Sequence, residues 1–222
     1  MPNLQDNRRE LQGYVARKLG VLQKQHLNEN RPSAKAQLAC LRREATKEIG
    51  SSLDTWELEF GDMPGSFAGR GSAAPTAGEQ AVHIAFTLYA IHQQSQDAPM
   101  FQRTNRSANE LHGLGHAASQ LAYLSRKNER GEQLEQGEMP RRLRALVTAD
   151  SMEEVRHYAR QLVHQFRSES IPLDYATFSG QLYEFFNPAR KDKVRLEWGR
   201  EFAQWRAPET SSINRQAQGN DD

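Results

Sequence analysis

AVHIAFTLYAIHQQS, residues 81–95, is the longest nearly uninterrupted apolar run in an otherwise polar chain. At 100° per residue its apolar side chains point in almost every direction, so the pattern predicts a helix that other helices surround. Just before it, Thr76 and Glu79 have the spacing of a capping box, in which each side chain accepts a hydrogen bond from the other residue's backbone amide. A strand is the weaker alternative, because strands usually last about four to eight residues.

The composition bounds the class of protein. The chain has 222 residues, 37% of them hydrophobic, which favours one domain with appendages. Basic and acidic residues number 29 and 28, so net charge alone does not indicate a nucleic-acid partner. No run reaches the ~20 apolar residues of a membrane span, and the N-terminal residues lack the apolar segment of a secretory signal. We therefore expect a cytoplasmic protein without membrane contact, in which the single Cys40 is a half-buried structural thiol.

Apolar side chains at helical spacing recur along most of the chain, and no segment requires a strand partner. The sequence therefore predicts an all-α fold, a compact irregular bundle of about eight helices. Residues 53–61, where aromatic and acidic side chains alternate, predict a short extended piece instead. Further helices are expected over residues 8–27, over 33–49 with Ser33 as N-cap, from a second capping box at 107–110, after Pro140, from a third capping box at 151–154, from Asp174 to Phe186, and after Asn187.

Residues 1–207 are predicted to form a single all-helical domain. Two polar segments interrupt it: a long mobile loop rich in Gly, Ala and Pro at 62–78, and an acidic exposed linker at 128–139. Residues 208–222 are polar and poor in apolar side chains, which predicts a disordered C-terminal tail.

Motifs for catalysis are weak. His112 and His116 have the i,i+4 spacing that can hold zinc on one helix, but the HExxH pattern needs glutamate where Gly113 stands, and no third ligand is nearby in the sequence. Residues 113–118 match GxGxxA without a preceding strand, so that match is a false positive. The sequence contains no GxxxxGK[ST] and no GxSxG. We therefore predict no catalytic residue, no metal site and no cofactor.

The charges are segregated along the chain. Acidic residues gather in 54–62 and 129–138, while basic residues cluster elsewhere. If the basic helix faces converge, they form a groove that phosphate groups occupy through charge-assisted hydrogen bonds. The alternative for any one cluster is an ordinary solvated surface. The clusters are Arg31, Lys35, Arg42, Arg43 and Lys47; Arg103 and Arg106; Arg141, Arg142 and Arg144; and Arg190, Lys191, Lys193 and Arg195.

Five stretches, in their order and spacing, resemble the CasB family, the small subunit of the type I-E CRISPR surveillance complex Cascade. They are AQLACLRR (36–43), TLYAIHQQS (87–95), RRLRALVTADS (141–151), IPLDY (171–175), and the tryptophan and phenylalanine at 198 and 202. The resemblance implies an all-helical, non-catalytic subunit, present in two copies beside the backbone and large subunits. It would contact the guide RNA and the target DNA and hold the displaced DNA strand.

By position, the resemblance carries the family's basic surface onto Arg42 and Arg43, onto Arg141 and Arg142, and onto Arg160. In the family a basic loop often precedes a helix that starts Ser-Leu-Gly-Arg, whereas residues 105–113 here read NRSANELHG. Two other functions compete with nucleic-acid binding. One is a helical protein-binding adaptor without direct nucleic-acid contact, and the other is a metal-dependent nuclease or hydrolase.

Overall fold

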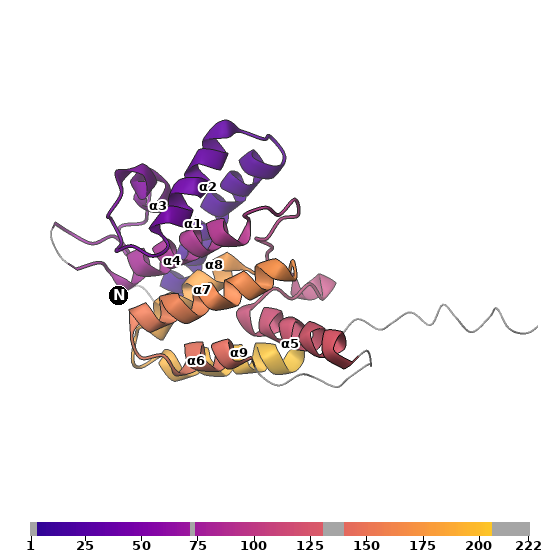
Figure 1. Cartoon of the computed structure of the whole chain (residues 1–222). Helices are drawn as coiled ribbons and strands as arrows, with labels where there is room; N and C mark the ends of the chain where they lie inside the picture. Colours follow the sequence, from indigo (N-terminus) through magenta and orange to yellow (C-terminus); the bar gives the residue numbers. More distant parts are fainter. Residues whose placement is uncertain (1–3, 72–73, 131–139, 206–222) are drawn as a thin grey trace, which may run out of the picture.

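The computed structural model describes residues 4–71, 74–130 and 140–205, and the fold below is that of these residues. They form nine α-helices and two 3-10 helices, with two isolated bridges and no strand, so the all-α prediction is confirmed (Figure 1). The elements are α1 (Leu4–Leu27), α2 (Pro32–Glu44), η1 (Leu53–Thr55), α3 (Trp56–Phe60), α4 (Ala77–His92), η2 (Arg106–Ala108), α5 (Leu114–Arg130), α6 (Arg141–Thr148), α7 (Met152–Ser168), α8 (Tyr175–Phe185) and α9 (Lys191–Gln204).

The expected central helix is α4. Its capping box is present, with the Glu79 amide donating to the Thr76 hydroxyl at 3.1 Å and the Thr76 amide donating to the Glu79 carboxylate at 2.8 Å. Every residue from Ala81 to His92 is buried. Helices α2, α7 and α8 pack around α4, so the apolar side chains on all its sides leave water.

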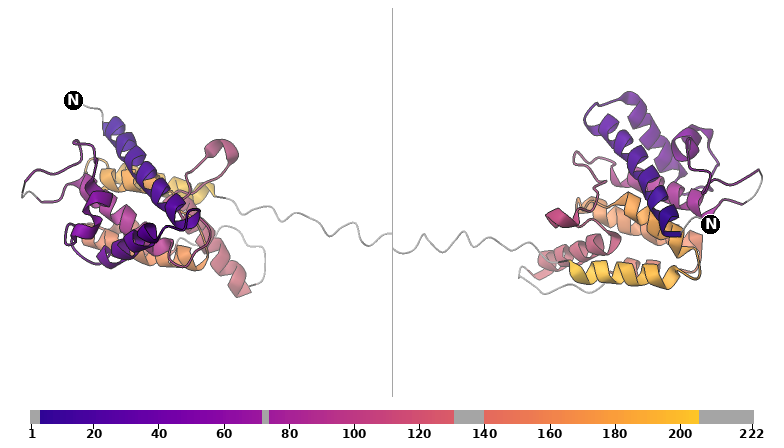
Figure 2. Two further views of the ribbon diagram at one scale, coloured as in Figure 1. Left: turned by 90° about the horizontal axis from the view of Figure 1, so that it is seen from above. Right: turned by 180° about the vertical axis from the view of Figure 1, so that it is seen from behind.

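The remaining helices extend this core in pairs. Helix α1 packs along α8, α5 packs along α9, and α6 packs against α7. Figure 1 shows α7 in front of α4, whereas α1 and α9 come to the front when the molecule is seen from behind (Figure 2). The molecule therefore has two faces that different helices form, one around α2 and α7 and one around α1, α8 and α9.

The loop at 62–78 is anchored by one aromatic side chain. Phe67 is only 2% exposed, and its ring meets the ring of Tyr183 edge to face at 5.4 Å. The Thr76 hydroxyl donates to the Phe67 carbonyl, and a Cβ at Gly78 would lie 2.7 Å from the Cβ of Phe67. The loop thus contributes a side chain to the core. Its mobility stays a prediction.

Residues 53–60 are helical, so the prediction of an extended piece over 53–61 was wrong. The Ser52 hydroxyl accepts from the amide of Asp54 and starts η1. The alternating pattern misled because Trp56 is 44% exposed, whereas the buried residues of the segment are Thr55 and Glu59. The Glu59 carboxylate lies 3.0 Å from Nδ1 of His83 on α4.

The bounds of α2 also differ from the prediction. Pro32 occupies the first turn and Arg31 is the N-cap, so Ser33 does not cap the helix. The helix ends at Glu44 rather than near residue 49. There the Glu44 carboxylate accepts from the Ser51 hydroxyl at 2.6 Å and from Lys47 Nζ at 3.0 Å, which holds the chain in a turn after the helix.

The second capping box, at 107–110, was wrong as well. Asn105 caps η2 instead, and Asn109 adopts the left-handed conformation with φ 56°. The amide of His112 then donates to the Thr104 hydroxyl at 3.0 Å, and α5 begins only at Leu114. His112 therefore precedes the helix that carries His116, and the i,i+4 pair assumed for a zinc site does not exist.

The expected linker extends beyond the residues that the structure describes, because 131–139 lie outside them, as does the expected tail at 208–222. A single hydrophobic cluster runs through the described helices, from α1 to α9. In this part of the chain, no helix is both long and apolar enough to cross a membrane.

Candidate nucleic-acid interface

Helix α7 presents a row of basic side chains to solvent. Arg156, Arg160 and His164 are spaced by four residues and Arg167 follows three later, so they share one side of the helix. The buried stripe Val155, Ala159, Leu162, Val163 and Phe166 lies on the adjacent side of the helix and packs on the core.

Helix α2 adds its own arginines beside this row. Arg42 Nη1 donates to the Ala90 carbonyl at 3.4 Å, and Arg167 Nη1 lies 3.5 Å from the Ile91 carbonyl and 3.2 Å from Gln94 Oε1. Both carbonyls belong to the last turn of α4, where a helix carries partial negative charge. The C-terminus of α4 therefore brings guanidinium groups from α2 and α7 to one place.

The ionisation of these groups reflects their crowding. The pKa of Arg42 is lowered, first by burial and then by the charges of Arg167 and Arg43. The pKa of His164 is lowered by burial and by Arg167 and Arg160. Burial, together with Lys35 and Arg42, also lowers the pKa of His26. Arg42 of α2 thus lies close enough to Arg167 of α7 for the second charge to lower the pKa of the first.

We call this surface the α2–α7 face, defined by Lys35, Arg42, Arg43, Arg156, Arg160 and Arg167. Within the described ranges only Arg156 has a carboxylate partner, Glu48 at 3.5 Å, and it also donates to the Lys47 carbonyl at 3.0 Å. Glu153 lies at the end of the face, where it lines a small pocket with Arg156, His157 and Arg160. The other five cations have no carboxylate partner in this part of the chain, and of these Arg42 and Arg167 donate to carbonyl oxygens of α4.

Helix α6 continues the face through polar contacts. Arg142 Nε donates to Gln161 Oε1 at 2.9 Å, and Gln161 Nε2 lies 2.6 Å from Nε2 of His157. Arg141 and Arg144 are exposed on the side of α6 away from its buried leucines. The structure thus places α6 beside the pocket that Arg160 lines.

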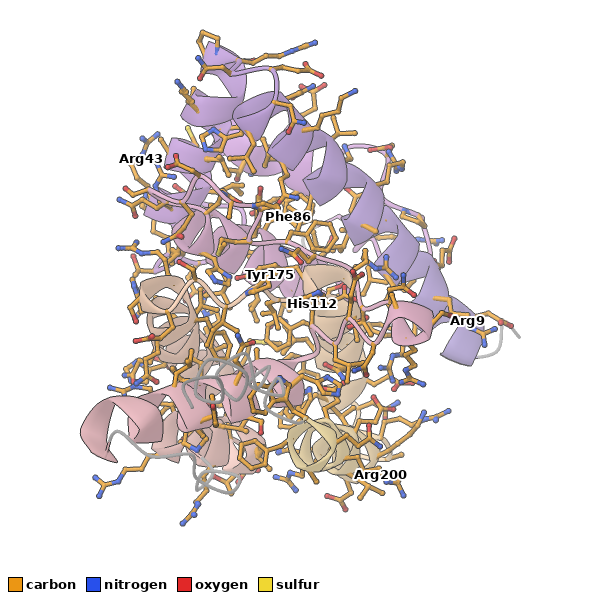
Figure 3. The ribbon with its side chains drawn as sticks, turned by 90° about the vertical axis from the view of Figure 1, so that its right-hand side faces the viewer. Arg9, Arg43, Phe86, His112, Tyr175 and Arg200 are labelled. Atoms are coloured by element: carbon orange, nitrogen blue, oxygen red, sulfur yellow. The ribbon has the colours of Figure 1, made fainter. Side chains whose placement is uncertain are left out.

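The other predicted basic residues lie elsewhere. Arg103 pairs at 3.4 Å with Asp174, the buried N-cap of α8. Arg106 lines a separate pocket with Arg9 and Arg200. Figure 3 shows Arg43 at one edge of the molecule and Arg9 and Arg200 at the opposite edge. The basic clusters therefore do not converge on one groove.

The fourth cluster, at 190–195, is largely neutralised. Lys191 Nζ lies 2.6 Å from Asp150, and Arg195 Nη1 lies 3.0 Å from Asp192. Lys193 lies 3.8 Å from Glu184. Lys191, Lys193 and Arg195 are therefore paired with carboxylates of the protein itself and are less available to an external anion.

Among the described residues, no group of three or more His, Cys, Asp or Glu side chains is placed to hold a metal ion. His116 is buried, and burial lowers its pKa to about 4, with the charge of Arg106 acting in the same direction. The nuclease alternative thus has no ligand set in this part of the chain.

Sequence reasoning missed Arg156 and Arg167 on the α2–α7 face. The signal was available, because both belong to the polar side of a capped helix whose apolar side was correctly identified. What was missing was the position of α7 next to α2, which only the packing on α4 decides.

Fold and surfaces together define the class of this protein as an all-helical one with charged faces. The profile of the CRISPR-associated protein Cse2 family matches residues 37–202. The crystal structure of CasB from Thermobifida fusca resembles this chain with a TM-score of 0.65 and 30% sequence identity, covering 87% of this chain and 97% of that one. No curated protein matches. The chain belongs to the Cse2 family of CRISPR-associated proteins, which implies a structural subunit of Cascade.

Proposed function

We propose that this chain is a non-catalytic, nucleic-acid-binding subunit of a type I-E Cascade complex. In this role it contacts the backbone of the guide RNA and target DNA and stabilises the displaced non-target strand of the R-loop. Other Cascade subunits and a second copy of the chain are its protein partners.

The observation that carries the proposal is the α2–α7 face. Five of its cations have no carboxylate partner in the described part of the chain, and three helices supply or extend it. Arginine binds phosphate oxygens through paired charge-assisted hydrogen bonds. A row of such groups suits a polyanion that lies along the surface, and backbone contacts of this kind are independent of sequence.

A test in the assembled complex uses Arg43→Ala with Arg160→Ala. Neither residue has an ion pair among those described, and Arg43 makes only a contact with Cys40 at 3.0 Å, so the fold should tolerate both changes. The near-balanced exchange between duplex DNA and heteroduplex is tipped by protein contacts to the backbone. We expect reconstituted Cascade that carries this double variant to release unwound target DNA faster than the wild-type complex. The guide–target mismatches that the complex tolerates should not change. Retention equal to that of the wild type would contradict the proposal.

Contact with protein partners has support of its own. Val21, Leu53 and Trp56 are 52%, 73% and 44% exposed, which is unusual for large apolar side chains. A pocket bordered by Val21, Asp54 and Leu58 adjoins them. If the chain is instead an adaptor without nucleic-acid contact, Leu53→Ser with Trp56→Ser will abolish its incorporation into the complex, while the arginine variants will behave like the wild type.

A further inference from the structure

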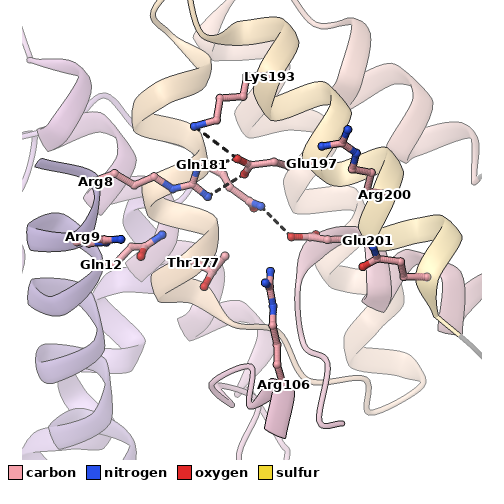
Figure 4. Close-up of a pocket in the computed structure, with 11 residues that line it drawn as sticks. Arg8, Arg9, Gln12, Arg106, Thr177, Gln181, Lys193, Glu197, Arg200 and Glu201 are labelled. Carbon is pink, nitrogen blue, oxygen red and sulfur yellow. Dashed lines mark hydrogen bonds and ion pairs between the residues drawn. The ribbon is translucent and has the colours of Figure 1, made fainter. Parts of the chain in front are cut away.

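A second basic pocket lies between α1, η2, α8 and α9, on the side opposite the α2–α7 face (Figures 3 and 4). Its volume is about 620 Å³, within the range of ~300–1,000 Å³ that ligand pockets occupy. Unlike an ordinary pocket for an apolar ligand, it has no aromatic or aliphatic residue in its lining. It is lined by Arg8, Arg9, Gln12, Arg106, Thr177, Gln181, Lys193, Glu197, Arg200, Glu201 and Gln204.

The acidic residues of the pocket are already engaged. The Glu197 carboxylate accepts two hydrogen bonds from Arg8, at 3.0 and 2.8 Å, and Arg8 also pairs with Glu184 at 2.8 Å. The Glu201 carboxylate accepts from the Gly115 amide and from Gln181 Nε2, each at 2.9 Å. These contacts fix the floor of the pocket and direct its carboxylates toward protein donors.

Three guanidinium groups are left over. Arg9 comes from α1, Arg106 from η2 and Arg200 from α9, and none has a hydrogen-bond or ion-pair partner among the described residues. In Figure 4, Arg106 extends from η2 toward Gln181 and Glu201, while Arg9 lies beside Arg8 and Gln12. Separate elements thus bring unpaired donors to one polar pocket with a fixed floor, and guanidinium groups so placed can donate to phosphate oxygens.

We infer that this pocket is a second, separate binding site for the phosphodiester backbone of a nucleic-acid strand. The lining offers no aromatic side chain on which a base could stack, whereas it offers several guanidinium groups, so the strand is held mainly by its phosphates. The inference does not require that the α2–α7 face binds nucleic acid. If both surfaces do, one subunit holds two strand segments on opposite sides.

The test counts bound strands. A short oligothymidylate, too short to wrap around the protein, is titrated into the full chain, and stoichiometry is measured by native mass spectrometry. Arg9→Ala with Arg200→Ala removes two exposed, unpaired guanidinium groups and should leave the circular dichroism spectrum unchanged. Arg17→Ala with Lys18→Ala is the matched control, because it removes the same charge from two side chains that pair with Asp62 at 2.7 and 2.6 Å.

We expect the Arg9/Arg200 variant to bind one strand fewer than the wild type and the control variant to bind as many as the wild type. If the Arg9/Arg200 variant loses that strand and the Arg43/Arg160 variant binds as many strands as the wild type, the pocket is supported. The same result overturns only the proposal that the α2–α7 face binds nucleic acid. An Arg9/Arg200 variant with wild-type stoichiometry overturns the pocket, whatever the face does. Weakened binding of polyglutamate with unchanged DNA binding also overturns it, in favour of an acidic protein segment.

Discussion

Nδ1 of His92 lies 2.9 Å from the phenolic oxygen of Tyr175, so the last residue of α4 is hydrogen-bonded to the first residue of α8. Both side chains are completely buried, and their rings meet edge to face at 5.9 Å. Because α4 carries the C-terminal carbonyls that anchor Arg42 and Arg167, this contact fixes the helix end on which the α2–α7 face is built.

The buried histidine predicts a pH-dependent stability. Burial lowers the pKa of His92 from 6.5 to about 3, so between these values the unfolded chain binds a proton that the folded chain does not. The free energy of unfolding should therefore fall as pH falls through this window, by up to about 1.4 kcal/mol per pH unit from this residue. His92→Gln should be less stable than the wild type at neutral pH. Its free energy of unfolding, measured by denaturant titrations at several pH values, should fall less steeply as pH falls. The exposed His157→Gln is the control, and an unchanged slope in His92→Gln would refute this assignment.

Truncation of the α4 core should be costly. Phe86 is fully buried and Leu88 is 3% exposed, at the centre of the helices that surround α4. We expect Phe86→Ala and Leu88→Ala each to lower the free energy of unfolding by roughly 2 to 5 kcal/mol. Leu196→Ala, at a position 52% exposed, should change it by less than about 1 kcal/mol. If Phe86→Ala and Leu88→Ala melt at the same temperature as Leu196→Ala, α4 is not central to the core.

The contact between α5 and α9 depends on a glycine. A Cβ at Gly115 would lie 2.2 Å from the Trp198 carbonyl oxygen and 2.6 Å from the Phe202 amide nitrogen. We expect Gly115→Ala to destabilise the protein by about 1 to 3 kcal/mol through forced separation of the two helices. Gly199→Ala, inside α9 with nothing within 4 Å, should instead stabilise it by up to about 1 kcal/mol. Equal melting temperatures for the two variants would contradict this packing.

The purified chain should hydrolyse neither DNA, RNA nor nucleotides. The described residues contain no metal-binding group, and His112 and His116 do not share a helix. The measurement is cleavage of labelled substrates with and without added divalent metal. Metal-stimulated cleavage that His112→Ala abolishes would revive the nuclease hypothesis.

The sequence predicted those parts of the fold whose signals are local. The capping boxes at Thr76 and Ser151 and the N-cap Asp174 are all present, because each depends on residues within one turn of chain. The start of α5 was mispredicted because Asn105, not Ser107, is the N-cap in this segment, and the helix that it caps is the short η2. Local spacing does not show which of two plausible caps the tertiary contacts favour.

The candidate site was partly predictable for a related reason. Arg42 and Arg43 stood out as a pair, but their grouping with Arg160 and Arg167 depends on α2 and α7 meeting at the end of α4. The pocket of Arg9, Arg106 and Arg200 joins residues that are far apart in the sequence. Only the packing of α1 on α8, and of α8 on α9, brings them together.

The most direct test of the central claim is the salt dependence of single-stranded DNA binding by the isolated chain. Each phosphate neutralised contributes about −0.7 to the slope of log affinity against log salt, so Arg43→Ala with Arg160→Ala should flatten the slope by about one unit or slightly more. The flattening should be the same for DNA of any sequence. Arg17→Ala with Lys18→Ala should leave the slope unchanged, because both side chains already pair with Asp62 and neither belongs to the α2–α7 face. A wild-type slope in the Arg43/Arg160 variant, with a changed slope in the control, would contradict a nucleic-acid interface on the α2–α7 face.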